Sequence, residues 1–187
     1  METQSIINVD ISELKGYKKC GHFELNEKKS KTLWRFNMCC QNEKGTHTYI
    51  IVVNNIVKKI GCSITNISNT AGYNVGNGGS PSDRTTGIHY YIARELYNGN
   101  NVTFWIQMSP IVEVQVPDIF GNISTIETPI CKERIEKHHR DSFKKKYNCL
   151  PEWNKQEGGR KCDWGPTIKK ICNALCNKTT LEYDNTD

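Results

Sequence analysis

Nine cysteines occur among the 187 residues of this chain, and four of them lie between Cys149 and Cys176. A disulfide bond typically stabilises a domain by about 2–4 kcal/mol, mostly by restricting the unfolded chain. We therefore expect a disulfide-stabilised fold, in which the odd count leaves one cysteine unpaired or bonded to another chain. The cysteines in this prediction are Cys20, Cys39, Cys40, Cys62, Cys131, Cys149, Cys162, Cys172 and Cys176.

Cys39 and Cys40 are neighbours in a segment that we predict to be a strand, so their side chains should point to opposite faces. We expect them to pair with two different partners, one with Cys20 and the other with Cys62. The full connectivity stays open, because spacing alone does not select among the pairings.

Four N-x-[ST] sequons fall at predicted turns or strand ends, where a glycan would be exposed: Asn66, Asn101, Asn122 and Asn177. Disulfides persist in oxidising compartments. We therefore expect a secreted protein, or one on an extracellular surface. The first ten residues, METQSIINVD, contain no apolar signal core, so the leader is expected to have been removed or to lie outside this sequence.

Zinc binding is the alternative reading of the cysteines, and it requires a reducing compartment. Structural zinc sites usually combine two close cysteine pairs, whereas in the tail only Cys172 and Cys176 are spaced in that way. His138 and His139 are adjacent, so their side chains should point in different directions. We predict no metal and no other cofactor. An intracellular zinc-stabilised adaptor or nucleic-acid-binding protein is the alternative function.

The chain up to residue 129 is rich in Ile, Val, Thr and Tyr, which favour strands. Asn54-Asn55 and Asn98-Gly99 are typical of tight hairpin turns. We predict a mainly β, α+β fold with an antiparallel β-sandwich-like core over residues 1–129. Its predicted strands are 32–40, 46–53, 56–64, 88–97, 102–108 and 111–118.

Residues 130–187 form a predicted Cys-rich, partly helical C-terminal extension, packed on the core or part of a single domain with it. Residues 131–147 lack Gly and Pro and are predicted to be helical. A second short helix is predicted at 165–176. Residues 70–87 contain five glycines and are predicted to form a surface loop or a contact loop.

No local motif identifies a catalytic centre. The sequence contains no G-x-S-x-G, no H-E-x-x-H and no cysteine-protease signature, and most of its histidines are scattered. We therefore predict that the protein is not an enzyme. A secreted hydrolase whose catalytic residues are distant in sequence is a second alternative.

The sequons and the predicted cystines are similar to those of viral or parasite surface glycoproteins. That resemblance implies a domain that binds a host protein, such as a receptor or a cytokine. Exposed aromatic residues would supply contact area and lysines would steer the encounter. The residues predicted to contact the partner are Tyr73, Trp153, Trp164, Lys144, Lys145 and Lys146.

The charge balance is only moderately basic, with a formal net charge of +5. We expect at most weak contact with glycosaminoglycans or other polyanions, and no nucleic-acid binding. No apolar run approaches the roughly 20 residues of a membrane-spanning helix, so no membrane span is predicted.

Overall fold

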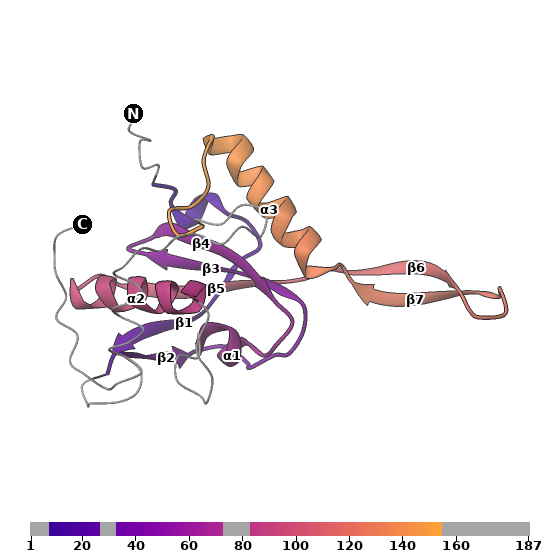
Figure 1. Ribbon diagram of the computed structural model, residues 1–187, viewed down its shortest axis with the longest axis horizontal. Helices are drawn as coiled ribbons and strands as arrows, with labels where there is room; N and C mark the ends of the chain where they lie inside the picture. Colours follow the sequence, from indigo (N-terminus) through magenta and orange to yellow (C-terminus); the bar gives the residue numbers. More distant parts are fainter. Residues whose placement is uncertain (1–7, 27–32, 73–82, 155–187) are drawn as a thin grey trace.

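The computed structural model describes residues 8–26, 33–72 and 83–154 (Figure 1). They form a five-stranded antiparallel sheet, a separate two-stranded hairpin and three α-helices. The strands are β1 (Lys18–Leu25), β2 (Trp34–Met38), β3 (His47–Val53), β4 (Ile56–Ser63), β5 (Val102–Met108), β6 (Ile111–Pro117) and β7 (Ile123–Pro129). The helices are α1 (Ile67–Gly72), α2 (Asp83–Tyr97) and α3 (Lys132–Tyr147), with a short 3-10 helix, η1, at Ile11–Glu13.

The five-stranded sheet has the order β2-β1-β5-β3-β4, so β5 joins two hairpins that come from earlier parts of the chain. The β3–β4 hairpin turns through Asn54 and Asn55, whose φ angles are 46° and 68°. Asn accepts this left-handed backbone more readily than most residues. The hairpin predicted at this Asn-Asn pair is therefore confirmed.

Both faces of the sheet are covered, and β3 shows why. Its alternate side chains Tyr49, Ile51 and Val53 pack with residues of α1 and α2, whereas Ile50 and Val52 pack with Phe143 of α3. All seven residues of β3 are buried. A strand covered on both sides reads as a continuous apolar run, which is the pattern that predicted this burial.

The predicted fold class is confirmed at the level of a mainly β, α+β fold with antiparallel sheets. A β-sandwich-like core is not found among the described residues, because helices cover the five-stranded sheet where a second sheet was expected. The predicted strand at 88–97 belongs to α2. Ile88, Ile92 and Leu96 recur every fourth residue and pack against the sheet, and this burial outweighs the β propensity of the segment.

The Asn98-Gly99 pair ends α2 and does not form the predicted hairpin. The Gly99 N–H donates to the Leu96 carbonyl at 3.0 Å, and Gly99 has φ 77°. Glycine adopts this conformation without a steric penalty, so the same dipeptide suits a helix end as well as a hairpin. Of the loop predicted at 70–87, residues 70–72 belong to α1 and residues 83–87 belong to α2, and residues 73–82 lie outside the described residues.

The helix predicted at 131–147 is confirmed as α3, whereas the one predicted at 165–176 lies outside the described residues. Cys131 precedes the first residue of α3, and Asn148 ends it in a left-handed conformation with φ 57°. None of the described helices combines the length and the hydropathy needed to cross a membrane.

Candidate functional site

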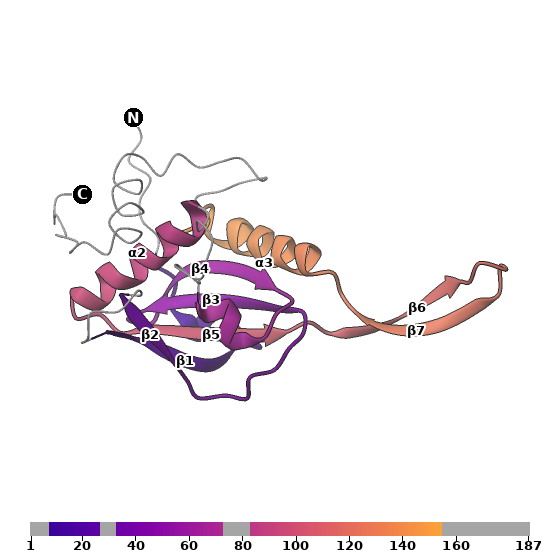
Figure 2. The same cartoon turned by 60° about the horizontal axis from the view of Figure 1, so that its bottom comes forward.

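Four strand ends meet at one end of the five-stranded sheet, and polar side chains collect there. The antiparallel register places Lys18 opposite Ile106, and His47 opposite both Ser63 and Met108. The hairpin of β6 and β7 starts from this end, and its closing strand leads into α3 (Figures 1 and 2). We call this region the polar end of the sheet.

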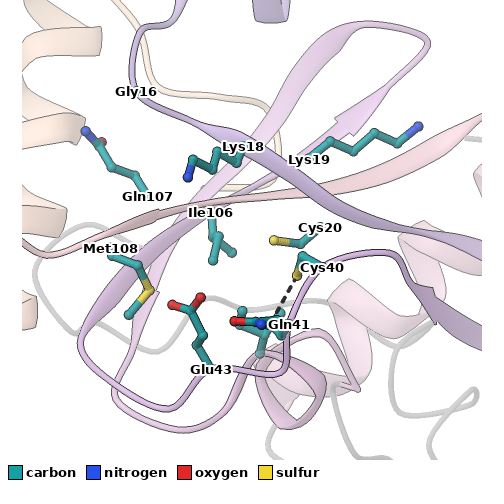
Figure 3. Close-up of a pocket in the computed structure, with 11 residues that line it drawn as sticks. Gly16, Lys18, Lys19, Cys20, Cys40, Gln41, Glu43, Ile106, Gln107 and Met108 are labelled. Carbon is teal, nitrogen blue, oxygen red and sulfur yellow. Dashed lines mark hydrogen bonds between the residues drawn. The ribbon is translucent and has the colours of Figure 1, made fainter.

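A pocket of about 330 Å³ opens at the polar end (Figure 3). It lies between the starts of β1 and α1, the end of β5 and the loop that follows β2. Its lining residues are Gly16, Lys18, Lys19, Cys20, Cys40, Gln41, Glu43, Ile67, Ile106, Gln107 and Met108.

The pocket carries one carboxylate and two ammonium groups. Glu43 comes from the loop after β2, whereas Lys18 and Lys19 come from β1. The two lysine side chains extend in opposite directions in Figure 3. Lys18 therefore brings its charge toward the end of β5, and Lys19 carries its charge away from it.

Gln107 is among the lining residues, but its side chain extends away from Ile106 and Met108 in Figure 3. Its Oε1 atom is buried and has no hydrogen-bond partner among the described residues. Gly16 leaves room for this amide: a Cβ there would lie 2.5 Å from Gln107 Nε2, and φ at Gly16 is 80°. An unpaired buried acceptor costs free energy unless a ligand or water donates to it. The pocket thus offers a cation and an anion to a polar ligand.

Two thiols form the inner wall of the pocket. Cys20 is 1% exposed, and Figure 3 shows its sulfur near that of Cys40. Burial, and then the contact with Cys40, raise the pKa of the Cys20 thiol. A thiolate is the nucleophilic form of cysteine, so Cys20 is unsuited to nucleophilic catalysis at neutral pH.

His47 holds α1 in place and does not face the pocket opening. Its Nδ1 atom lies 2.8 Å from the Gly45 carbonyl, and its Nε2 atom lies 3.2 Å from the Thr70 hydroxyl. Burial lowers the pKa of the imidazole, so the neutral ring is favoured. In the neutral tautomer with hydrogen on Nδ1, the ring donates to the Gly45 carbonyl and presents Nε2 to the Thr70 hydroxyl.

A second polar cluster lies on the α3 face of the same end. The Cys62 thiol donates to Glu136 Oε2 at 2.8 Å, and burial followed by this carboxylate raises the pKa of Cys62 to about 12. The Tyr17 hydroxyl donates to Thr48 Oγ1 at 3.3 Å, and burial raises its pKa to about 12. Both groups are protonated at neutral pH. The Cys62 thiol connects β4 to α3, and the Tyr17 hydroxyl connects the segment before β1 to β3.

The sequence prediction of disulfides is wrong for the described cysteines. Cys20, Cys39, Cys40, Cys62, Cys131 and Cys149 are all free thiols. Cys20 lies beside Cys40 as expected, but the sulfurs are not bonded, and Cys62 binds Glu136 in place of a cysteine. Cys162, Cys172 and Cys176 lie outside the described residues.

The structure does not bring the predicted partner-binding residues together. Trp153 is 1% exposed and stacks on Tyr91 at 5.4 Å between ring centroids, so it belongs to the core. The three lysines, Lys144, Lys145 and Lys146, lie in the last turn of α3, and Lys146 pairs with Glu13 at 3.0 Å. Tyr73 and Trp164 lie outside the described residues.

Three of the predicted glycosylation sites are described. Asn66 accepts the Asn69 N–H at 3.0 Å and so caps α1. Asn101 is exposed before β5, and Asn122 is exposed at the β6–β7 turn, where its amide donates to Asp118 at 3.0 Å. Glycan attachment at these sites stays a prediction, and Asn177 lies outside the described residues.

No protein-family model matches the sequence, and no curated protein matches it. Solved structures do match. The fold resembles that of bacteriophage T4 EndoII. A mutant of EndoII aligns with a TM-score of 0.51 and 17% identity over 78% of this chain and 99% of the EndoII chain. The restriction endonuclease HPY188I in complex with product DNA aligns with a TM-score of 0.43 and 19% identity over 80% of this chain and 88% of that chain.

The likeness to EndoII, a nuclease, corrects the functional expectations drawn from the sequence. The secreted glycoprotein domain that binds a receptor or cytokine is overturned, as is the prediction of a protein that is not an enzyme. The expectation of no nucleic-acid partner is corrected too. The error came from interpreting the clustered cysteines as disulfides. Disulfides implied an oxidising compartment, and that compartment implied an extracellular binding function.

The residues of the pocket had no local signal in the sequence. They come from positions 16–20, 40–43, 67 and 106–108, which only strand pairing brings together. A correct placement of the 102–108 strand beside β1 would have shown Lys18 near Gln107. Without that pairing, each residue reads as an ordinary surface group.

Proposed function

We propose that this protein binds duplex DNA at the polar end of the sheet and hydrolyses a phosphodiester bond there. The observation that carries the proposal is the alignment with EndoII, which extends over 99% of that nuclease. This chain therefore contains counterparts for nearly the whole fold of the neighbour. The activity itself is inferred, because at 17% identity the likeness concerns the fold.

The charges around the pocket support a phosphate-bearing ligand. The segment before and within β1 carries Lys15, Lys18 and Lys19, and Lys44 follows Glu43 in the loop. Lysines contact DNA mainly at the phosphates, and these contacts give affinity that does not depend on base sequence. The positive charge lies where the pocket opens, so a backbone phosphate can approach Lys18.

The proposed roles follow from the chemistry of the lining groups. Lys18 would neutralise a phosphate oxygen as negative charge develops in the transition state. Glu43 is the carboxylate available to accept a proton from an attacking water. The thiols of Cys20 and Cys40, together with His47, would hold the elements that position these groups.

Plasmid cleavage and duplex binding test the proposal, with and without Mg²⁺. We expect Glu43→Gln to lower the cleavage rate by about 100-fold with duplex affinity largely kept. Lys18→Ala should weaken duplex binding and reduce the slope of log affinity against log salt by about one. Lys19→Ala is the matched control, since its side chain extends the other way, and it should change cleavage less than Lys18→Ala.

Three results would each contradict a different part of the proposal. A wild-type protein that neither binds nor cuts duplex DNA would reject the function. Binding without cleavage would reject the catalytic half and leave a DNA-binding protein. Equal losses in the two lysine variants would reject the specific role given to Lys18.

A further inference from the structure

Three sulfur-containing side chains line the pocket at the polar end of the sheet. Cys20 belongs to β1, Cys40 belongs to the loop after β2, and Met108 is the last residue of β5. Figure 3 shows the sulfurs of Cys20 and Cys40 next to each other, with Met108 across the pocket from them. The pocket therefore presents soft sulfur donors beside the charged groups of Lys18 and Glu43.

Strand pairing holds the two thiols in this arrangement. The Cys39 N–H donates to the Cys20 carbonyl at 2.8 Å, so the chain is still bonded to β1 at the residue before Cys40. Cys20 is 1% exposed, whereas Cys40 is half-buried and its thiol donates to the Gln41 carbonyl at 3.4 Å. Because both cysteines line the pocket, a small ion that enters it reaches both sulfurs.

Two other nearby cysteines are outside this arrangement. Cys39 is exposed, and its Sγ atom lies 3.9 Å from the Lys19 carbonyl oxygen. The Cys62 thiol is bonded to Glu136 on the α3 face of the sheet. Neither residue lines the pocket, so Cys39 in particular is an internal control for chemistry at the Cys20–Cys40 pair.

The donor set selects the class of ion. Thiolate and thioether sulfurs favour Cu(I), whereas Mg²⁺, Ca²⁺ and Mn²⁺ prefer oxygen ligands. A structural zinc site takes four ligands. Within residues 8–26, 33–72 and 83–154, no three His, Cys, Asp or Glu side chains are grouped so that they could hold an ion. Two thiols and one thioether therefore suit Cu(I), which accepts a low number of soft ligands.

We propose that Cys20 and Cys40 bind one Cu(I) ion in the pocket, with Met108 as a third and weaker ligand. Each thiol gives up its proton when it binds the metal. The unit of one Cu(I) and two thiolates then carries a single negative charge. The ammonium group of Lys18 in the same pocket favours this charge, and the Glu43 carboxylate opposes it.

The state of the free ligands sets how the affinity depends on pH. Burial, and then the contact with Cys40, raise the pKa of the Cys20 thiol, so the metal has to displace a proton there. The affinity for Cu(I) should therefore rise with pH. Met108 is 37% exposed, and its unbranched side chain can adapt its position to an ion held by the two thiols.

Timed alkylation of the reduced, metal-free full chain under nitrogen, with and without Cu(I), tests the proposal. Cu(I) is supplied as its bicinchoninate complex, and peptide mass spectrometry follows each cysteine. Cu(I) should slow the reaction of Cys40 with a maleimide by about tenfold or more, because the metal occupies the reactive thiolate. Cys20→Ala should remove this protection, whereas Cys39→Ser is the matched control and should keep it.

Met108→Leu tests the third ligand at a partly exposed position, where a change of similar volume leaves the fold intact. It should lower the affinity for Cu(I) by about tenfold, read from the bicinchoninate concentration that abolishes the protection of Cys40. Circular dichroism establishes that Cys20→Ala, at a buried position, stays folded.

Unchanged alkylation of Cys40 in the presence of Cu(I) overturns the proposal. Protection that persists in Cys20→Ala, or that is lost in Cys39→Ser, overturns the assignment of the Cys20–Cys40 pair. An unchanged affinity in Met108→Leu rejects the thioether ligand. These measurements contain no DNA, so their outcome is separate from that of the proposed cleavage activity.

Discussion

Asn154 makes two hydrogen bonds to the backbone of Ile60, a residue 94 positions earlier in the chain. Its Oδ1 atom accepts the Ile60 N–H at 2.7 Å, and its Nδ2 atom donates to the Ile60 carbonyl at 2.7 Å. Beside it, the Trp153 N–H donates to the Lys58 carbonyl at 2.8 Å. These contacts, together with the Val57 N–H that donates to the Val9 carbonyl at 2.8 Å, satisfy the outer edge of β4, whose other edge pairs with β3.

Asn154→Ala should lower the free energy of unfolding by about 2–4 kcal/mol, because it leaves both polar groups of Ile60 unpaired in a buried place. Chemical denaturation measures this loss. Glu152→Gln is the matched control: it removes the neighbouring ion pair with Lys58 at 2.6 Å and should cost no more than about 1 kcal/mol. Similar losses in the two variants would mean that the Asn154 amide is not what satisfies the edge of β4.

Gly61→Ala should destabilise the fold by about 1–3 kcal/mol through overpacking. A Cβ at Gly61 would overlap the ring of Tyr49, with Cε1 only 2.8 Å away. The ring has little freedom to move, because it is buried and stacks on Phe104 at 5.2 Å between centroids. A double-mutant cycle measures the clash, and Gly61→Ala should cost less in a Tyr49→Leu background. Additive effects of the two substitutions would contradict the steric explanation.

The free energy of unfolding should fall as the pH is lowered, because His89 binds a proton in the unfolded chain. The ring is 0% exposed and stacks on Trp34, and burial lowers its pKa from 6.5 to about 4. Between these values the unfolded state binds more protons than the folded state, so stability is full above pH 6.5 and is lost toward pH 4. The loss amounts to at most about 3 kcal/mol.

His89→Gln is the variant that isolates this effect, because its amide oxygen can still accept the Leu33 N–H that His89 Nε2 accepts at 3.4 Å. Unfolding free energies measured from pH 7 to pH 4 should fall less steeply in the variant than in the wild type. Parallel curves for the two proteins would show that His89 is not the titrating group.

The described cysteines should differ sharply in their rates of alkylation. Cys39 and Cys131 are exposed and should react first with a maleimide at neutral pH. Cys20 is buried and its pKa is raised, so we expect its reaction to be slower by about 100-fold. Peptide mass spectrometry of timed samples gives the rates. In denaturant without reductant all six described cysteines should react, and any that needs a reductant would be in a disulfide.

Local sequence patterns were sufficient for several elements. Turn chemistry, apolar runs and helical periodicity act over a few residues. They therefore predicted the Asn54-Asn55 turn, the buried strand β3 and the helix α3. The same reasoning failed for α2. Its Ile and Tyr residues favour strands in isolation, and only the fit of Ile88 and Ile92 against the sheet makes the segment helical.

The candidate site was not predictable in the same way. Lys18, Glu43 and Gln107 are far apart in the chain and carry no shared motif. They meet because β1 pairs with β5 and because the loop after β2 folds over that pair. The choice of strand partner depends on the burial of whole faces, which no local window contains.

The sequence by itself determined the turn residues, the antiparallel α+β class and the amphipathic helix α3, because each depends on neighbouring side chains and local backbone preference. Tertiary structure decided the order of the strands, the pocket at the polar end and the state of the described sulfurs. Strand order follows from long-range burial on both faces of the sheet. A cysteine becomes a cystine, a ligand or a buried thiol according to what lies beside it, and here Cys20 lies against an apolar core and Cys62 against a carboxylate.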